Sequence, residues 1–217
     1  RHGVRRQRQM CIRDRLYKTK KPDALRIASD IVFRRARAHE ITGQARHLMP
    51  LAIGAKLQGP VLWLHASWEH TRLHAEGVRD HLNPGRIVFG TARNEMDLLW
   101  AAEEILRSGL VPLVILDLAS PPNLTSIRRL HLAAQDGAGK DTTPIVFVLT
   151  PEAGGAPGVE TRWRLDPMPS LALDNACSWR LTRQRARSAP PREWEMRLSS
   201  SQHISVTSIR SEESESA

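Results

Sequence analysis

Uninterrupted apolar runs and amphipathic stretches alternate along the middle of this chain. After a short strand at 38–42, apolar runs that predict buried strands occupy 61–65, 86–90, 110–118 and 144–149. Apolar residues recur every three or four positions, as in helices with one buried face, over 45–57, 94–108 and 124–135. Strands that alternate with helices in this way are typical of an α/β doubly wound fold with a mostly parallel sheet.

The stretch from Asn94 to Gly109 carries the clearest helix signals. Asn94 can cap the N-terminus, and Asp97 stands where a capping box has its acid. Ser108 and Gly109 close the helix in the way that many helices end. We therefore expect a well-formed helix that leads directly into the apolar run at 110–118.

Beyond Pro151 the pattern changes to shorter strands and turns. A Gly/Pro-rich loop precedes a predicted strand over 161–165. Two further strands, over 178–187 and 192–198, flank an Ala-Pro-Pro turn. This arrangement predicts an antiparallel hairpin at the end of the globular domain.

The two ends of the chain differ from its middle in composition. Residues 5–15 match the translation of a transposase sequencing adapter, so we interpret residues 1–15 as a sequencing artefact, the alternative being a natural basic arm. Removing them deletes six arginines and one aspartate, so the formal charge of +9 falls to +4, which is weak evidence for a nucleic-acid surface. The remaining expectations are a poorly structured leader over 16–35, a globular domain over 36–198 and a disordered Ser/Glu-rich tail over 199–217.

Composition excludes several classes of protein. With 41% hydrophobic and 25% charged residues, the chain fits one globular domain with tails. No apolar run approaches the ~20 residues that span a bilayer, and the basic N-terminus has no apolar stretch of a secretory signal. Cys11 and Cys177 cannot build a disulfide framework, so a reducing, cytoplasmic compartment is expected.

Three segments resemble the recombinase RecA. In NEMDLLWAAEEILRSGLVPLVILD, a helix rich in Ala, Leu and Glu ends in RSG and leads into an apolar strand closed by an aspartate, as at RecA's Walker B motif. The segment HEITG resembles the strand that enters RecA's Walker A loop, and RLTRQRARSAPPREWEM resembles its late basic strand pair.

Five segments in the right order are similar to the ImuA family, RecA-like proteins of bacterial damage-induced mutagenesis. They are HEITGQAR, DLLWAAEEILRSG, IRRLHLAA, LTPEAGGAPGVETRW and WRLTRQRARSAPP, and the resemblance covers most of residues 38–198. It implies a RecA-like doubly wound, mostly parallel sheet with a C-terminal antiparallel hairpin and a degenerate P-loop. It also implies a non-catalytic accessory role in translesion synthesis during the SOS response to DNA damage.

The same resemblance implies partners. Relatives act with ImuB, a homologue of Y-family polymerases, and with an error-prone C-family DNA polymerase. The shared fold adds RecA as a further expected partner and leaves direct DNA contact open. Such a protein is expected in the cytoplasm, at the nucleoid when induced, and away from membranes.

The segment that would bind phosphate departs from an active Walker A loop. Residues 43–50 read GQARHLMP, so the first glycine, Gly43, is present, whereas the second glycine, the lysine and the hydroxyl are absent. Arg46 is a poor substitute for the lysine without the loop geometry. Asp117 matches the Walker B position at the carboxyl end of a strand. We interpret Gly43, Arg46 and Asp117 as a degenerate nucleotide site with no catalytic residue and no cofactor.

Three other features favour non-functional interpretations. Ser67 occupies the position of RecA's catalytic carboxylate. Gly137 to Thr142 resembles GxGKT, but it follows a helix and precedes a strand, which is the reverse of the required order. His70 and His74 have the spacing of metal ligands, but zinc needs three or four converging ligands, so no metal site is expected.

Arginine is concentrated on the predicted terminal hairpin. The candidate partner- or DNA-binding residues there are Arg180, Arg183, Arg185, Arg187 and Arg192. Arginine suits phosphate and carboxylate partners because its planar fork can bond bidentately. The alternative interpretation is a strand edge whose charge opposes aggregation.

Two other functions stay open at this point. One is an active RecA-like ATPase with residual activity, which the missing lysine argues against. The other is a cell-division inhibitor resembling SulA, which shares a degenerate fold of this kind. An adjacent gene for an ImuB-like polymerase would favour mutagenesis over division inhibition.

Overall fold

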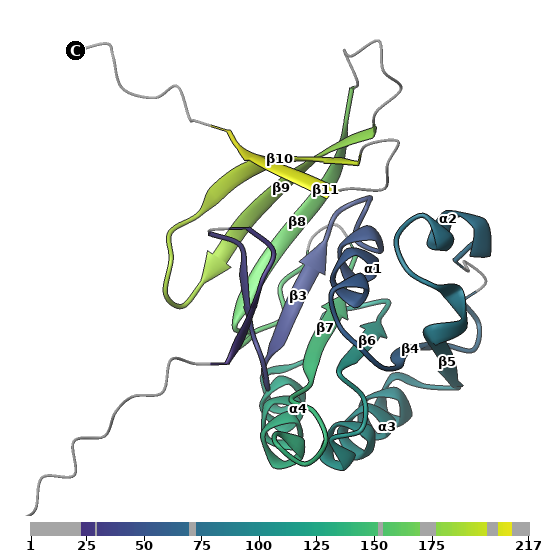
Figure 1. The fold of residues 1–217 in the computed structure, drawn as a ribbon. Coiled ribbons are helices and arrows are strands. Elements are labelled where there is room, and N and C mark those ends of the chain that lie inside the picture. The colour runs from purple at the N-terminus through teal and green to yellow at the C-terminus, as the bar shows by residue number, and fades with distance from the viewer. Residues whose placement is uncertain are drawn as a thin grey trace, which may run out of the picture.

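The computed structural model describes residues 23–28, 30–69, 73–151, 154–169, 177–198 and 204–209. The segment interpreted as an artefact, residues 1–15, lies outside the described residues. Within them, nine strands form one sheet in the order β11-β10-β9-β8-β3-β7-β6-β4-β5 (Figure 1). A separate hairpin of β1 (Ala24–Arg26) and β2 (Val32–Arg34) packs against one face of this sheet.

The larger part of the sheet is parallel and the smaller part is antiparallel. The parallel strands are β3 (Ala38–Thr42), β4 (Val61–Ala66), β5 (Ile87–Ala92), β6 (Leu113–Asp117), β7 (Ile145–Leu149) and β8 (Thr161–Met168). The antiparallel strands are β9 (Cys177–Ala186), β10 (Arg192–Leu198) and β11 (Ile204–Ser208). The helices are α1 (Leu48–Ala55), α2 (Ala75–Arg79), α3 (Glu95–Ser108) and α4 (Leu124–Gly137), with a 3-10 turn at Pro84–Arg86. The expected α/β fold, mostly parallel with a C-terminal antiparallel hairpin, is confirmed.

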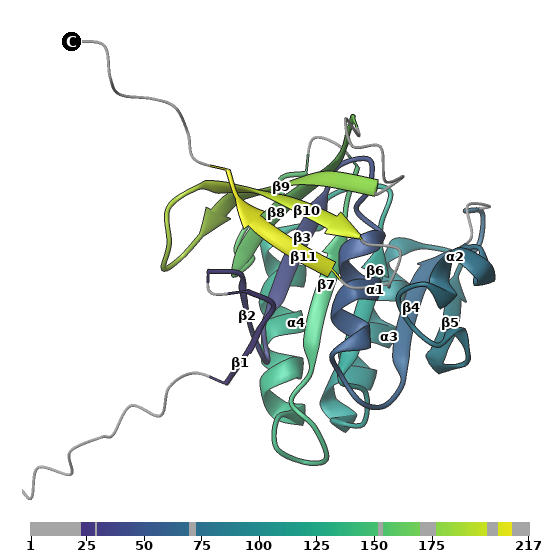
Figure 2. The ribbon, with the colours of Figure 1, turned by 45° about the horizontal axis from the view of Figure 1, so that its top comes forward.

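Helices cover the parallel strands on both faces (Figure 2). On one face Met49 of α1 packs in the same apolar cluster as Trp63 of β4. On the other face Leu106 of α3 belongs to a second cluster, together with Val114 of β6. Successive strand residues point to opposite faces, so both clusters need apolar residues from the same strands. This is why the central runs show no polar alternation.

No helix of the described residues is long and apolar enough to cross a membrane.

The helix signals around α3 are confirmed. The Asn94 side chain accepts a hydrogen bond from Asp97 N at 2.8 Å and caps the first turn. Gly109 ends the helix in the left-handed conformation, with φ of 71°. A side chain at this position would collide with the Gly137 carbonyl at the end of α4, so the glycine also allows the two helix ends to approach.

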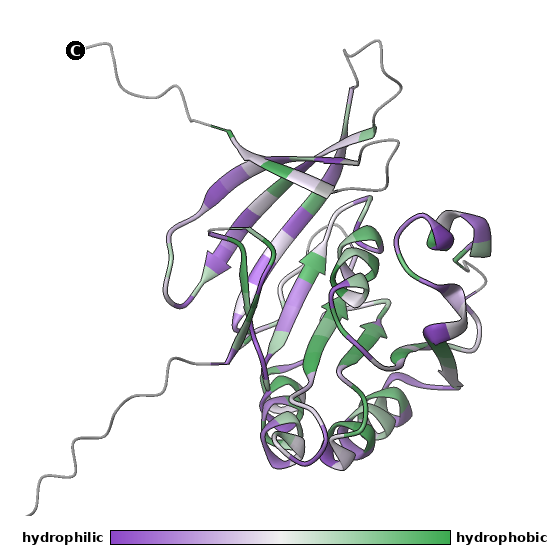
Figure 3. Cartoon of the chain, viewed as in Figure 1, coloured by the Kyte–Doolittle hydropathy of each residue, from purple (hydrophilic) through white to green (hydrophobic). Residues whose placement is uncertain are grey.

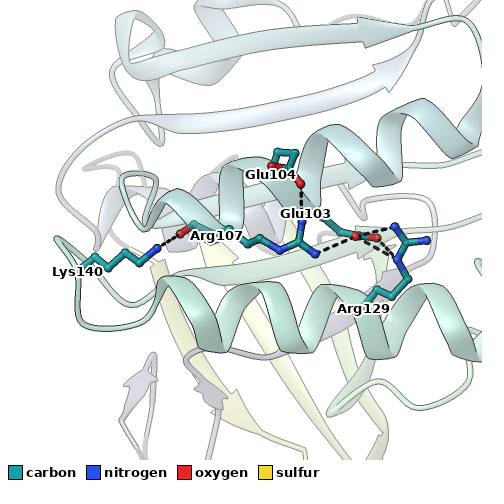
Figure 4. A network of polar contacts seen from close by, with 5 residues as sticks. All are labelled: Glu103, Glu104, Arg107, Arg129 and Lys140. Atoms are coloured by element: carbon teal, nitrogen blue, oxygen red, sulfur yellow. Dashed lines mark hydrogen bonds and ion pairs between the residues drawn. The ribbon is translucent and has the colours of Figure 1, made fainter.

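A buried carboxylate links α3 to α4 (Figure 4). Glu103 is 1% exposed, and its oxygens accept from Arg129 of α4 at 2.8 to 3.1 Å. Arg107, one turn further along α3, lies 3.5 Å from the same carboxylate and also pairs with Glu104. Lys140, beyond the end of α4, donates to the Arg107 carbonyl at 2.6 Å. The network therefore links two helices that lie side by side.

The expectation of a poorly structured leader over 16–35 is wrong for its described part. Residues 24–26 and 32–34 pair as the two strands of the β1–β2 hairpin, and Ile31 and Phe33 are fully buried. The Phe33 ring packs against Phe147 and Trp163, with ring centroids 5.2 and 5.4 Å apart. Two strands of three residues, interleaved with arginines, are too short to show a periodic pattern. Much of the burial of Phe33 comes from Phe147 and Trp163, which lie more than a hundred residues away in the chain.

The expectation of a disordered tail over 199–217 is also wrong in part. Residues 204–208 form β11, which pairs with β10 in antiparallel register. Ile209 continues the pairing by donating its N–H to the Glu193 carbonyl. A strand of this kind gains its stability from the neighbouring strand, so a local composition rich in Ser did not reveal it. The rest of the tail lies outside the described residues.

The C-terminal part of the sheet has two different faces. Hydrophilic and hydrophobic residues alternate along its strands (Figure 3). Trp163, Leu181 and Trp194 point into the apolar core that continues from α1. Their neighbours along β8 and β9, Arg162 and Arg180, are half-buried or exposed and point the other way. Alternation with a period of two therefore returns where the parallel pattern ends.

Candidate functional site

The loop after β3 occupies the place that the sequence assigns to a Walker A motif. Its backbone N–H groups are engaged with β8, because Gln44 N donates to Asp166 Oδ1 (3.2 Å) and Ala45 N to Leu165 O (3.0 Å). Gly43 has φ of 94°, and a side chain there would collide with the Leu165 carbonyl. A phosphate-binding loop points such N–H groups at its ligand instead. Gly43 is thus explained by close contact with β8.

Asp117, at the carboxyl end of β6, is paired by the same loop. His47 Nε2 donates to Asp117 Oδ2 at 2.8 Å, and Arg46 Nε lies 3.9 Å from Oδ1. The His47 ring also packs beside Trp63, with centroids 5.8 Å apart. The structure therefore brings Arg46 and Asp117 together, as expected from the sequence, and adds His47, which the sequence did not indicate.

This arrangement works as an internal link between β6 and the start of α1. Both oxygens of Asp117 face nitrogen atoms of the loop, whereas a magnesium-binding aspartate offers an oxygen to the ion. Ser67, in the position of RecA's catalytic carboxylate, is exposed in the turn after β4. The segment from Gly137 to Thr142 lies between the end of α4 and the start of β7. A Walker A loop instead follows a strand and precedes a helix.

Sequence reasoning missed the buried carboxylate of Glu40 in β3. Its Oε1 accepts from Thr150 Oγ1 (2.8 Å), Gly155 N (2.8 Å) and Ala156 N (3.0 Å), while Oε2 pairs with Arg162 of β8. Glu40 is fully buried, so these partners replace the water that a carboxylate otherwise needs. The available signal was a charged residue in the middle of a strand that is predicted to lie within the sheet. Glu40 ties the loop after β7 to β3 and β8.

The expectation that Arg183 contributes to a binding surface is wrong. Arg183 is 6% exposed, and its guanidinium lies over the rings of Trp194 and Trp163, at 5.0 and 5.7 Å from their centroids. It donates to Pro190 O (3.0 Å) and to Asp30 O (2.9 Å). Burial lowers the pKa of Arg183, with Arg192 adding to that effect. The residue joins the β9–β10 turn to the N-terminal hairpin.

The other four arginines of the hairpin lie in different surroundings. Arg192 pairs with Asp30 and donates to Ser208 Oγ (2.9 Å), which holds β10 against β11. Arg187 lies 3.8 Å from the buried Glu160. The remaining two, Arg180 and Arg185, are exposed on the face of the sheet opposite Trp163.

Glu160, just before β8, is a second buried carboxylate that the sequence did not reveal. Its Oε1 accepts from Arg34 at 3.0 Å, and Arg37 and Arg187 lie 3.7 and 3.8 Å from its Oε2. The three arginines come from the N-terminal hairpin, the start of β3 and the end of β9. One carboxylate thereby brings Arg187 together with two arginines that lie about 150 positions earlier in the sequence.

His39 forms the centre of a buried hydrogen-bond chain. Its Nε2 donates to the Arg34 carbonyl (2.9 Å), which leaves Nδ1 to accept from the Thr161 hydroxyl (2.7 Å). The same hydroxyl accepts from Trp163 Nε1 at 2.7 Å. Burial lowers the pKa of His39 to about 4, against an ordinary value of 6.5, so the ring is neutral at pH 7.

The remaining candidate residues do not converge on one another. His65 lies within β4 and contacts the Ala66 carbonyl and the Phe89 ring, while His74 precedes α2. His70 lies outside the described residues. No group of three His, Cys, Asp or Glu side chains suited to a metal ion occurs among the described residues. Cys177 is exposed at the start of β9.

Comparisons with known proteins add little to this geometry. No protein-family model and no curated protein sequence matches the chain. Among solved structures, the crystal structure of SulA from Pseudomonas aeruginosa is 22% identical, covering 52% of this chain and 97% of that chain, with a TM-score of 0.39. A likeness at that TM-score carries no argument about function.

Proposed function

We propose that this chain is a RecA-like binding protein without nucleotide hydrolysis, which acts as an accessory protein in DNA-damage-induced translesion synthesis. The observation that carries the proposal lies in the loop after β3. The N–H groups of Gln44 and Ala45 donate to β8, and Asp117 is bonded to His47. These groups would have to break their present bonds before they could hold a triphosphate and its Mg²⁺.

The biological setting of the proposal comes from the sequence. The five ImuA-like segments support a role with three partners: an ImuB-like homologue of Y-family polymerases, an error-prone C-family polymerase and RecA. The protein would act in the cytoplasm, at the nucleoid when its expression is induced. A scaffold that keeps an intact buried sheet around a closed nucleotide site fits a protein that works through its surface. Of the five arginines first considered for a partner- or DNA-binding surface, we propose that Arg180 and Arg185, which are exposed, contribute to it together with Arg187.

Magnesium-dependent ATP binding tests the first part of this proposal. Titration of the full chain with a fluorescent ATP analogue and Mg²⁺ is expected to show no saturable binding in the micromolar range, because β8 engages the N–H groups of Gln44 and Ala45 and the loop has no lysine. Asp141→Ala, at an exposed aspartate of the turn after α4, serves as the matched control. Saturable binding that Asp117→Ala abolishes and Asp141→Ala retains would overturn the proposal.

Binding of a purified ImuB-like polymerase homologue tests the second part. Double charge reversal, Arg180→Glu with Arg185→Glu, is expected to weaken binding about tenfold or more, because each arginine can supply a charge-assisted hydrogen bond. Arg128→Glu, at an exposed arginine of α4, is the control for charge reversal away from the hairpin. Binding by the double variant equal to that of Arg128→Glu would place the interface elsewhere.

The same variants separate a protein partner from DNA. If the arginines contact DNA, the affinity of the unmodified chain should fall steeply with salt, by roughly one unit of log–log slope for each phosphate neutralised. A protein partner is expected to show a shallower salt dependence that still requires Arg180 and Arg185.

A further inference from the structure

Strand β5 forms one edge of the nine-stranded sheet, at the end opposite β11 (Figure 1). On its inner side it pairs with β4, and within the described residues no strand pairs with its outer side. Such an edge presents a row of N–H and C=O groups that can serve as a template for a further strand. The edge lies far along the sheet from the arginines of the C-terminal hairpin.

The residues of β5 do nothing to keep another strand away. Its sequence, IVFGTA, contains no charged residue and no proline, which are the usual means of protecting an edge. Val88 and Phe89 are each 51% exposed. They point to opposite faces of the sheet because they are adjacent in a strand. A strand placed beside β5 would therefore cover apolar surface on both faces.

A hydrogen bond beside β4 shows which peptide groups of β5 are directed outward. The Ala92 carbonyl accepts from Ser67 N, just after β4, at 2.9 Å, so Ala92 directs its backbone groups toward β4. Successive residues of a strand direct these groups to opposite sides. Phe89 therefore directs its N–H and C=O toward the open edge, as do Ile87 and Thr91.

A second copy of β5 has the matching pattern of peptide groups. In an antiparallel pair centred on Phe89, the two Phe89 residues exchange both of their backbone hydrogen bonds. Each Ile87 carbonyl then accepts from Thr91 N of the other copy, while the Ile87 N–H keeps its present bond to the Pro84 carbonyl. A twofold axis through Phe89 makes the two contributions identical, as in most homodimers.

The side chains are self-complementary in the same register. On the face that β5 shares with Trp63, the two Phe89 rings lie opposite each other, which is a favourable cross-strand pair. On the other face, Val88 lies opposite Gly90 of the second copy. The Cα atoms of such a pair are only about 4.5 Å apart, so the absence of a side chain at Gly90 leaves room for Val88. The fit occurs twice because of the twofold axis.

We propose that this chain forms a symmetric dimer in which the β5 strands of two copies pair antiparallel, centred on Phe89. The pairing continues the sheet from one copy into the other and covers Val88 and Phe89 of both. Since each copy contributes a single edge strand, the interface is small, and we expect a dissociation constant of about 1–100 µM. The dimer does not depend on the proposed role in translesion synthesis, because it uses a different part of the molecule.

Sedimentation velocity of the full chain at increasing concentration tests the dimer. The unmodified chain is expected to shift from monomer to dimer below about 200 µM. Phe89→Lys and Val88→Lys should each stay monomeric over the same range, because a lysine on an edge strand opposes pairing. Leu132→Lys, the same kind of change at an exposed leucine of α4, is the control and should dimerise like the unmodified chain. Thermal melting confirms that each variant is folded.

Three results would overturn the proposal. The first is an unmodified chain that stays monomeric throughout. The second is a folded Phe89→Lys or Val88→Lys variant that dimerises as Leu132→Lys does. The third is growth into filaments, which indicates a head-to-tail contact between different edges instead of a closed twofold pair.

Cysteine crosslinking tests the register, in a chain that also carries Cys11→Ser and Cys177→Ser. Phe89→Cys places two thiols opposite each other, with Cα atoms about 5.5 Å apart, which suits a disulfide. Thr91→Cys is the matched control on the same strand and face, because its opposite residue is Ile87 and its thiols are several residues apart. Mild oxidation should therefore link Phe89→Cys into a covalent dimer and leave Thr91→Cys unlinked. If Phe89→Cys stays unlinked, or both link equally, the proposed pairing is wrong.

Discussion

The parallel core and the C-terminal antiparallel strands belong to one continuous sheet but differ in where their polar residues lie (Figure 3). In the core, β6 and β7 are apolar on both faces because α1 covers one face and α3 and α4 cover the other. In the C-terminal part, β8, β9 and β10 place apolar residues on one face and charged residues on the other. The central strands of the first region are therefore covered on both faces, whereas the second region leaves one face of its strands uncovered by helices.

Charged residues also have different roles in the two regions. In the core, the carboxylates of Glu40, Glu103 and Asp117 bridge elements that are far apart in the sequence. On the outer face of the C-terminal sheet, Arg164 pairs with Asp166 and Arg197 with Glu195, each two positions along the same strand. Exposed pairs within one strand contribute little to stability, so a residue such as Glu195 can change without loss of the fold.

The largest effect is expected from Glu40→Ala. Removing the buried carboxylate leaves three hydrogen-bond donors and the cation of Arg162 without their acceptor, which should lower the free energy of unfolding by about 3–5 kcal/mol. Glu195→Ala on the outer face is the matched control and should change it by less than about 1 kcal/mol. Urea denaturation measures both, and equal losses would break the comparison between the two regions.

Arg183→Ala comes next and tests whether arginines of one hairpin differ in role. The variant loses two hydrogen bonds from a charged group and its contacts with two tryptophan rings, so we expect a loss of about 2–4 kcal/mol. Arg180→Ala, on the exposed side of the same strand, should stay within about 0.5 kcal/mol of the unmodified chain. Equal stability of the two variants would mean that the buried and the exposed arginines of β9 do not differ in their contribution to the fold.

The free energy of unfolding should also decrease as the pH is lowered, because His39 is buried in its neutral form. Its pKa is about 4 in the folded state and 6.5 ordinarily, so between these values the unfolded state binds more protons. Stability is thus present above pH 6.5 and is lost as the pH falls toward 4, by about 2 kcal/mol from His39 between pH 7 and pH 5. The pKa values of His131 and His81 are lowered by burial as well and act in the same direction.

Urea denaturation of the unmodified chain and of His39→Gln at pH 7 and pH 5 isolates this contribution. The variant starts less stable but should lose less between the two pH values, because it has no proton to bind at this position. An equal loss in both proteins would mean that His39 does not carry the pH dependence.

The smallest effect is expected at the link between α3 and α4. Glu103→Ala should cost about 1 kcal/mol, because Arg129 and Arg107 are partly exposed and can regain water when their partner is lost. Glu104→Ala, at the half-exposed neighbour that also pairs with Arg107, is the control and should be near neutral. Chemical denaturation at moderate salt measures both, and a loss of several kcal/mol would show that the helix pair depends on this network.

Much of the parallel core was predictable because its signals are local. The run from Leu113 to Leu116 has to be buried on both faces, and Asn94 and Gly109 mark the helix that precedes it. The missing lysine in the loop after β3 was equally visible. The bond between His47 and Asp117 was not, since it joins residues 70 positions apart.

The sequence by itself determined the order of strands and helices, the apolar core and the loss of the Walker A lysine, since each depends on residue type and short-range spacing. Only the tertiary structure decided which arginines of the hairpin are buried. Arg183 and Arg185 are two positions apart and would share a face in a regular strand. A register shift at Arg162/Trp163 instead sets Arg183 opposite Trp163 and Arg185 opposite Arg162. One extra residue in β9 thus reverses the direction of the next side chain, and no local pattern of charge contains that information.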